Sequence, residues 1–213
     1  FTITYASYLG GSLDDRPFGV AWDPASSSVF ITGTTTSSNF PSTAGAHSPS
    51  GPQGQHSGFL VKLDVDRPLA QQLRFGTFLH DSSPIDVAVL PGGMPAVVGQ
   101  ATDGFCGSLR CFRAVNSLYP ARFQLEQRPF LSVFSADGAS LPFASFLDAS
   151  GGSTYGFASG VAANGSPIVY VAMATTDGAL ASPGALQSSI VGNADALVQA
   201  IDLTGVTPAN GPP

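Results

Sequence analysis

The chain has 213 residues, a formal net charge of −6, and charged side chains at only 10% of its positions, against about 25% in ordinary soluble domains. The acidic balance argues against a nucleic-acid partner, which would need a basic surface, and no apolar run approaches the roughly 20 residues of a transmembrane helix. Serine, threonine, glycine and proline supply most of the remaining polarity, which favours strands and turns over long helices. We therefore expect an all-β protein that works outside the cell or on its surface, with its signal peptide already removed.

The N-terminal stretch introduces a motif that occurs three times, at residues 3–9, 73–79 and 141–147. Each copy places two aromatic residues three positions apart, with a small residue and a hydroxyl residue between them. The copies start 70 residues apart (3 to 73) and then 68 residues apart (73 to 141), and a fixed period of this kind indicates a repeat architecture. We expect each copy to open a repeat as its first strand. The first aromatic residue of each copy is expected in the core: Tyr5, Phe75 and Phe143.

The first repeat is predicted to occupy residues 1–72. After the opening motif, short apolar runs separated by turn residues predict three further strands, at 18–22, 29–33 and 59–64. The last of these alternates apolar and other residues, so its apolar side chains share one face. Trp22 ends the second strand and is expected in the core. Four short strands joined in this way predict one antiparallel sheet.

The second repeat (73–140) and the third repeat (141–206) keep the same order. Their later strands are predicted at 85–89, 95–99 and 130–134, and at 160–163, 168–172 and 197–202. The sequence thus predicts three four-stranded antiparallel units, followed by a Pro/Gly-rich tail or linker at 207–213.

Two cysteines, Cys106 and Cys111, lie five positions apart in the long loop of the second repeat. A disulfide closing so small a loop contributes roughly 2 kcal/mol on the chain-entropy estimate, and metal binding lacks further ligands nearby. We predict the disulfide, and with it an oxidising compartment; two free thiols are the alternative.

Several segments of the first repeat carry a recognisable pattern: Tyr8-Leu-Gly-Gly11, Gly19-Val-Ala-Trp-Asp23, Phe30-Ile-Thr-Gly33, Asn39-Phe-Pro41, Thr43-Ala-Gly-Ala46 and Gly58-Phe-Leu-Val-Lys-Leu-Asp64. The third repeat echoes it at 182–187 and 195–198, and the second repeat fits only at its strands. The pattern resembles one unit of the bacterial seven-bladed β-propeller repeat (SBBP-type) family. The resemblance implies four-stranded propeller blades in secreted or surface-attached bacterial proteins, and it implies no enzyme activity, no cofactor and no agreed ligand.

Three blades are fewer than a closed propeller needs, since propellers have about 4–8. They leave two apolar faces and several strand edges open, and another chain can pair at such sites. Three arrangements remain open. Two chains complete a six-bladed ring, chains dock head to tail into a filament, or the sequence is a fragment of a longer chain whose other blades lie elsewhere.

No catalytic or metal-binding constellation stands out in the sequence. The three histidines, His47, His56 and His80, are expected apart, in loops or at strand ends, without the spacing of metal ligands. The acidic pairs at 14–15 and 64–66 lack the pattern of a calcium loop and are interpreted as solvated turn carboxylates.

Two kinds of glycosylation site are candidates. Asn164-Gly-Ser166 is an N-glycosylation sequon, and the hydroxyl run Thr34, Thr35 and Thr36 could carry O-linked sugars. Unmodified turns are the alternative in both cases.

The leading functional hypothesis is a non-catalytic extracellular structural or adhesive protein that self-assembles through its unclosed ends into an oligomer or a surface filament. Its partner is then a further copy of the same chain. A glycan-binding propeller module is the second hypothesis. The third is a secreted propeller hydrolase, which would need a cleft with convergent Asp or His side chains.

Overall fold

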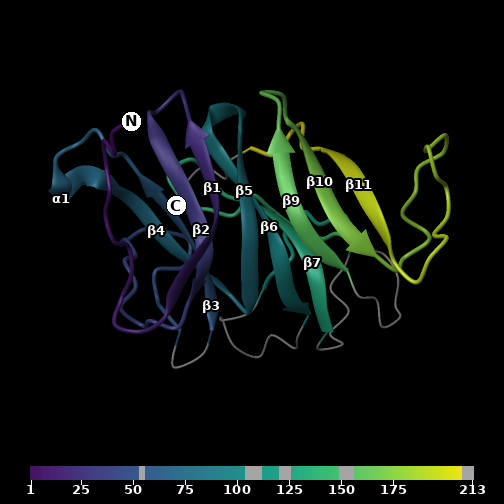
Figure 1. The fold of residues 1–213 in the computed structure, drawn as a ribbon, viewed down its shortest axis with the longest axis horizontal. Helices are drawn as coiled ribbons and strands as arrows, with labels where there is room; N and C mark the ends of the chain where they lie inside the picture. Colours follow the sequence, from purple (N-terminus) through teal and green to yellow (C-terminus); the bar gives the residue numbers. More distant parts are fainter. Residues whose placement is uncertain (53–55, 104–111, 120–125, 149–155, 208–213) are drawn as a thin grey trace.

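Three antiparallel sheets follow one another along the long axis of the molecule (Figure 1). The structure is a computed structural model that describes residues 1–52, 56–103, 112–119, 126–148 and 156–207. Each sheet is formed by strands that are consecutive in the chain, and none of the three sheets closes on itself. The prediction of an all-β fold is confirmed.

The first sheet has four strands in the order β1-β2-β3-β4. Their bounds are β1 Asp15–Asp23, β2 Ser28–Thr35, β3 Ser57–Leu63 and β4 Leu73–His80. Aromatic and β-branched residues are frequent in these strands, which suits a pleated sheet that is packed on other elements. A one-turn helix, α1 (Leu69–Gln72), precedes β4.

The second sheet also has four strands, in the order β5-β6-β7-β8. Their bounds are β5 Ser82–Leu90, β6 Met94–Asp103, β7 Glu126–Val133 and β8 Phe143–Phe146. A 3₁₀ turn (Pro91–Gly93) joins its first two strands, with Gly92 at φ 78°, a backbone angle that glycine adopts without steric cost.

The third sheet has three described strands, in the order β9-β10-β11. Their bounds are β9 Phe157–Ala163, β10 Ile168–Thr175 and β11 Asp195–Asp202. The expectation of four strands per unit therefore holds for the first two sheets, whereas in the third sheet the described residues supply three.

The aromatic motif occupies a different place in each unit from the one the sequence predicted. The second copy forms β4 and the third copy includes β8, so each closes the preceding sheet instead of opening the next one. The first copy, residues 3–9, forms no strand. A repeat period fixes the length of a unit but not the residue at which the unit begins, and cross-strand pairing decides that point.

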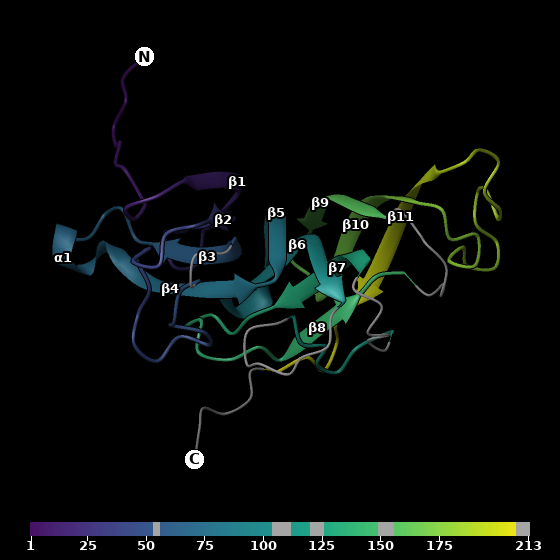
Figure 2. The ribbon, with the colours of Figure 1, turned by 90° about the horizontal axis from the view of Figure 1, so that it is seen from below.

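Two apolar layers join the three sheets. The layer between the first and second sheets is rich in phenylalanine, with Phe30, Phe75, Phe130, Phe134 and Phe146 buried. The layer between the second and third sheets is aliphatic and includes Leu131, Val133, Val169, Val171 and Ile201. The first strand of each sheet contacts the first strand of the next, β1 with β5 and β5 with β9. The three sheets are therefore packed side by side in sequence order (Figure 2).

Two residues that the sequence placed in the core are exposed. Tyr5 lies outside the sheets, unlike Phe75 and Phe143, which are buried. Trp22 is half exposed on β1. Tyr5 belongs to the motif copy without a strand and is held at its hydroxyl, which donates to Gln72 Oε1 at 3.0 Å, and Trp22 faces away from the second sheet. None of the helices in the described part of the chain has the length and apolar character of a membrane span.

Candidate functional site

The first sheet has an open apolar strip along β1, on the side away from the second sheet, whereas further across the same side Phe59 and Val61 of β3 are buried beside Phe40. Phe18, Val20 and Trp22 project from β1 on this side, and we call it the rear face. Val20 is 68% exposed, whereas Val87, its counterpart on β5 by strand register, is 3% exposed. Val87 is covered because it faces the first sheet, and nothing in the structure covers Val20.

The third sheet has an open apolar face on its opposite side. Phe157, Tyr170 and Val198 project there from three adjacent strands, and we call it the forward face. Val198 is 70% exposed, whereas its counterparts Leu60 on β3 and Leu131 on β7 are fully buried. Those two residues contact the next sheet along the chain, and Val198 has no such neighbour.

A groove runs beside β11, the edge strand of the third sheet. It has a volume of about 730 Å³ and lies between β11 and the loop at 176–194 that joins β10 to β11. Apolar and polar residues line it, including Leu180, Ser182, Leu186 and Gln187 from the loop, together with the aspartates Asp177, Asp195 and Asp202. Leu186 is fully exposed, so the loop presents apolar surface to the groove.

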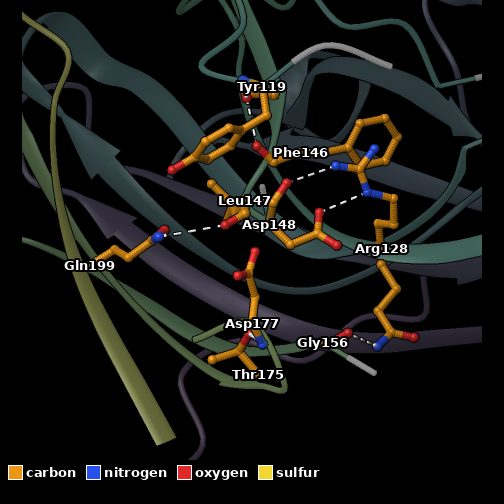
Figure 3. Close-up of polar contacts among 11 residues, drawn as sticks. Tyr119, Arg128, Phe146, Leu147, Asp148, Gly156, Thr175, Asp177 and Gln199 are labelled. Carbon is orange, nitrogen blue, oxygen red and sulfur yellow. Dashed lines mark hydrogen bonds and ion pairs between the residues drawn. The ribbon is translucent and has the colours of Figure 1, made fainter. Parts of the chain in front are cut away.

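A buried ion pair lies near Gln199, one of the residues that line the groove (Figure 3). Arg128 donates from Nε to Asp148 Oδ1 at 2.7 Å and from Nη2 to the Asp148 carbonyl at 2.8 Å, and its guanidinium lies 4.3 Å from the centre of the Phe146 ring. Both charged side chains are almost completely buried. Two-point binding of this kind fixes geometry, so the pair holds the ends of β7 and β8 together.

Gln199 of β11 connects the groove to this pair. Its Nε2 donates to the Leu147 carbonyl at 3.5 Å, and its Oε1 is buried without a hydrogen-bond partner among the described residues. A buried acceptor without a partner is costly. Gln199 lines the groove, so this unfavourable buried acceptor lies on the edge strand of the third sheet.

Lys62 and Asp23 form a second buried pair, in the first sheet. Their Nζ and Oδ2 atoms are 3.5 Å apart, and Nζ lies 4.9 Å from the centre of the Phe30 ring. Burial opposes the ionisation of Asp23, but hydrogen bonds from Ser26 and the Ala25 N–H, together with the Lys62 ammonium, outweigh it and hold the pKa of Asp23 below its usual 3.8. The only lysine of the chain thus lies inside the fold instead of on its surface.

A second pocket, of about 440 Å³, brings together two histidines that were predicted from the sequence to lie apart. His47 and His80 both line it, with Arg113 and the rings of Phe112 and Phe134. His80 Nε2 lies 2.9 Å from Ser48 Oγ. Burial, helped by the positive charge of Arg113, lowers the pKa of His47 below 6.5, so this imidazole is neutral at neutral pH.

The residues predicted for modification lie in three environments. Cys106 and Cys111 fall outside the described residues. Thr34 and Thr35 are buried in β2, where a sugar has no room, and Thr36 Oγ1 donates to the Asp14 carbonyl at 3.3 Å. Asn164 is exposed in the turn between β9 and β10, and its use as a glycosylation site stays a prediction.

The acidic pairs are structural in part. Asp15 accepts hydrogen bonds from Gly11 N at 2.7 Å and from Thr35 Oγ1 at 2.5 Å, so it fastens the N-terminal segment to the first sheet. Asp64 is mostly buried and pairs with Arg67 at 2.6 Å, which corrects its interpretation as a solvated turn carboxylate. Among the described residues no three His, Cys, Asp or Glu side chains are grouped closely enough to hold a metal ion.

Sequence reasoning did not single out the residues of the two open faces. Val20 and Val198 stand in strands whose patterns match those of buried strands, and no signal in the sequence distinguishes them. Strand alternation does place each of them on one definite side of its sheet, which becomes informative once the order of the sheets is known.

The comparison with known families concerns the first sheet. Residues 4–41 match the family model described as beta-propeller repeat (SBBP). No curated protein matches the sequence. The match covers the N-terminal motif, β1 and β2, the part in which the sequence pattern is clearest. The N-terminal part of the chain, residues 4–41, is therefore similar to a β-propeller repeat of the SBBP type.

Proposed function

We propose that this chain is a non-catalytic structural protein of the cell exterior, in which the three sheets act as propeller blades and copies associate head to tail. The forward face of the third sheet of one copy packs on the rear face of the first sheet of the next copy. The product is a closed ring of two chains or an open filament, depending on the rotation between copies.

One observation carries the proposal. Within the chain, the first sheet packs on the second and the second on the third through equivalent strand positions. Contact between the forward and rear faces of two copies would repeat this packing a third time. It would bury Val20 and Val198 as their counterparts Val87 and Leu131 are already buried. Contiguous exposed apolar side chains at both ends of one molecule are typical of an interaction surface.

Light scattering on the purified chain tests the proposal. The wild type is expected to form particles that are integer multiples of 21.7 kDa and that dissociate on dilution. Val20→Asp and Val198→Asp each place a charge on one face and are expected to remain monomeric. Both positions are already exposed in the single chain, so neither substitution disturbs its core.

Mixing the two variants gives the decisive result. Each variant keeps one intact face, so a head-to-tail interface predicts that the mixture forms a dimer that neither variant forms alone. Leu69→Asp, at an exposed site on α1 that belongs to neither face, is the matched control and should assemble like the wild type. A wild type that stays at 21.7 kDa at every concentration, or a mixture that stays monomeric, refutes head-to-tail assembly.

The second pocket favours a second candidate function, the binding of a glycan. It combines aromatic rings with polar side chains, as carbohydrate and other small-molecule sites do. A glycan array probed with the wild type and with Arg113→Ala tests it: binding that is lost in the variant supports a glycan site, and an array without signal removes it.

A further inference from the structure

The N-terminal segment 3–9 has the same motif as β4 and β8 but makes no strand pairing. Its second aromatic residue, Tyr8, is fully exposed, whereas the corresponding Phe78 and Phe146 are buried. The segment thus has the side chains of a fourth strand but is largely exposed; its contacts with its own first sheet are the Tyr5 hydroxyl, which donates to Gln72 Oε1 at 3.0 Å, and Leu9, which is partly buried.

In the first sheet, the fourth strand occupies a slot between β3 and a loop. β4 pairs with β3 on one side. On the other side the loop at 36–52 holds it, since Thr43 N donates to the Gly76 carbonyl at 3.0 Å and Phe78 N donates to the Ser48 carbonyl at 2.9 Å.

The second sheet repeats this arrangement. β8 pairs with β7, and Val115 and Ala144 exchange two backbone hydrogen bonds of 2.8 Å. Both fourth strands are therefore bound along both edges, and a loop of their own sheet supplies the outer partner.

In the third sheet the corresponding slot is the groove beside β11. The loop that borders it has the same turn as the loop of the first sheet. Ala185 N donates to the Ser182 carbonyl at 3.1 Å, as Ala46 N donates to the Thr43 carbonyl at 3.2 Å, and Gly184 and Gly45 both have positive φ, 78° and 86°. The described residues of the chain place no strand between this loop and β11.

The segment of the same molecule cannot fill this groove. Ser12 N donates to Asn39 Oδ1 at 2.9 Å and Leu13 N to Ser37 Oγ at 2.8 Å, so the chain is fastened to the first sheet just after the motif. The first and third sheets lie at opposite ends of the molecule, with the second sheet between them (Figure 1). An extended chain gains about 3.3–3.6 Å per residue, so the five residues from Ser7 to Ser12 cover about 18 Å at most, less than the roughly 20 Å of two sheet-to-sheet spacings.

We infer that residues 3–9 of a second copy enter the groove and pair with β11 as the fourth strand of the third sheet. The inference rests on the proposed head-to-tail assembly. β4 leads into β5, the first strand of the next sheet, and the segment 3–9 leads into β1 in the same way. Packing the first sheet of one copy on the third sheet of another therefore brings the donor segment to the acceptor groove.

The motif predicts the register of this pairing. Thr77 lies opposite Leu60 and Ser145 lies opposite Leu131. Ser7 has the position of Thr77 and Ser145 in the motif, so it is expected opposite Val198. Tyr8 then lies opposite Leu197, and Ala6 lies opposite Gln199.

The small residue of the motif supports this placement. A Cβ on Gly76 would stand 2.2 Å from the Pro41 carbonyl oxygen in the neighbouring loop, so the slot admits little more than glycine at that point. Ala144 occupies the position in β8, where the strand also adjoins a loop. Ala6 is identical to Ala144, so it suits a slot like that of the second sheet.

Cysteine cross-linking between two variants tests the inference. Directly opposed residues of antiparallel strands have Cα atoms about 4.5–5.5 Å apart, within the range of a disulfide. A mixture of Ser7→Cys and Val198→Cys chains under mild oxidation is expected to give a covalent dimer. A mixture of Ile3→Cys and Val198→Cys, off register by four residues or about 13 Å, should give at least about tenfold less.

The native cysteines stay in every variant, and the wild type oxidised in parallel gives the background. If the Ser7→Cys mixture cross-links no better than the Ile3→Cys mixture while light scattering shows assembly, strand donation is wrong and face-to-face packing stands. If light scattering shows only monomers, the proposed assembly itself is wrong.

A peptide experiment tests the groove without any assembly. A labelled peptide of residues 1–11 is added to the Val20→Asp chain, whose rear face is blocked, and fluorescence anisotropy follows binding. The peptide is expected to bind at least about tenfold more tightly than one carrying Tyr5→Asp and Tyr8→Asp, since the two aromatic residues supply its buried area. Equal affinities would show that the groove does not select the motif and would overturn the inference.

Discussion

Only 10% of the residues are charged, so each buried charged side chain has a large individual effect on the stability of the fold. Lys62 and Arg128 are both buried, each beside one aspartate and over one phenylalanine ring. A charge in such a place needs its partner, because the water that would otherwise solvate it has been removed. The two pairs therefore act as fixed points inside sheets that are otherwise held by apolar contacts.

Arg128→Met is expected to destabilise the fold by about 3–5 kcal/mol, because it leaves the Asp148 carboxylate buried and without its cation. The midpoint of urea unfolding measures the loss. The double variant Arg128→Met/Asp148→Asn should recover part of it. Arg16→Met, which removes an exposed arginine, is the control and should change little. Equal effects of the two arginine variants would contradict the role given to the buried pair.

His47 is expected to make the fold less stable on acidification. Its pKa in the folded state lies below 6.5 because of burial and the charge of Arg113, so between the two pKa values the unfolded chain binds more protons. Stability is therefore fully present above pH 6.5 and is lost as the pH falls through 6.5 toward the lower folded pKa. Unfolding midpoints between pH 5 and 8 should show this slope. His47→Asn should reduce it, and His56→Asn, at an exposed loop position, should leave it unchanged.

At the scale of the element, glycines set how closely paired strands approach. Gly33 on β2 and Gly99 on β6 hold the same position, each opposite a proline where the register shifts. A Cβ on Gly99 would stand 2.2 Å from the Ser83 carbonyl oxygen, and one on Gly33 would stand 2.1 Å from the Arg16 carbonyl oxygen. Both obstacles are backbone atoms, so the strands themselves would have to move.

Gly99→Ala is accordingly expected to cost about 1–3 kcal/mol through overpacking, seen as a lower urea midpoint with an unchanged slope. Gly178→Ala, where no atom lies within 4 Å of the added carbon, is the matched control and should be close to neutral. A neutral Gly99→Ala would mean that β5 and β6 separate more easily than their geometry suggests.

At the scale of the whole molecule, assembly is expected to follow the hydrophobic effect. The rear face (Phe18, Val20 and Trp22) and the forward face (Phe157, Tyr170 and Val198) are uncharged. Raising the salt concentration to about 1 M shortens the screening length to about 3 Å and should leave the particle mass unchanged or increased. Cooling should reduce the mass, because apolar association weakens in the cold. Particles that dissociate as salt is added would indicate that charges hold them together.

The sequence by itself determined the strands, their alternation and the threefold motif, because these depend on residue type and spacing along one chain. It also determined that the strands are rich in apolar side chains, which made an assembly worth predicting. Its prediction that the motif opens each sheet was wrong, because a repeat period does not say at which residue the unit begins.

Only the tertiary structure decided which side chains are covered. Val20 and Val87 stand in similar strands, and one is exposed because its sheet is first in the stack. Tyr8 and Phe78 belong to the same motif, and Tyr8 is exposed because its segment pairs with no strand among the described residues. His47 and His80 meet in one pocket because β4 passes beside the loop of its own sheet. Whether a side chain is buried depends on which other strands, sheets and loops pack against its own strand. The residue pattern along one strand does not contain that information.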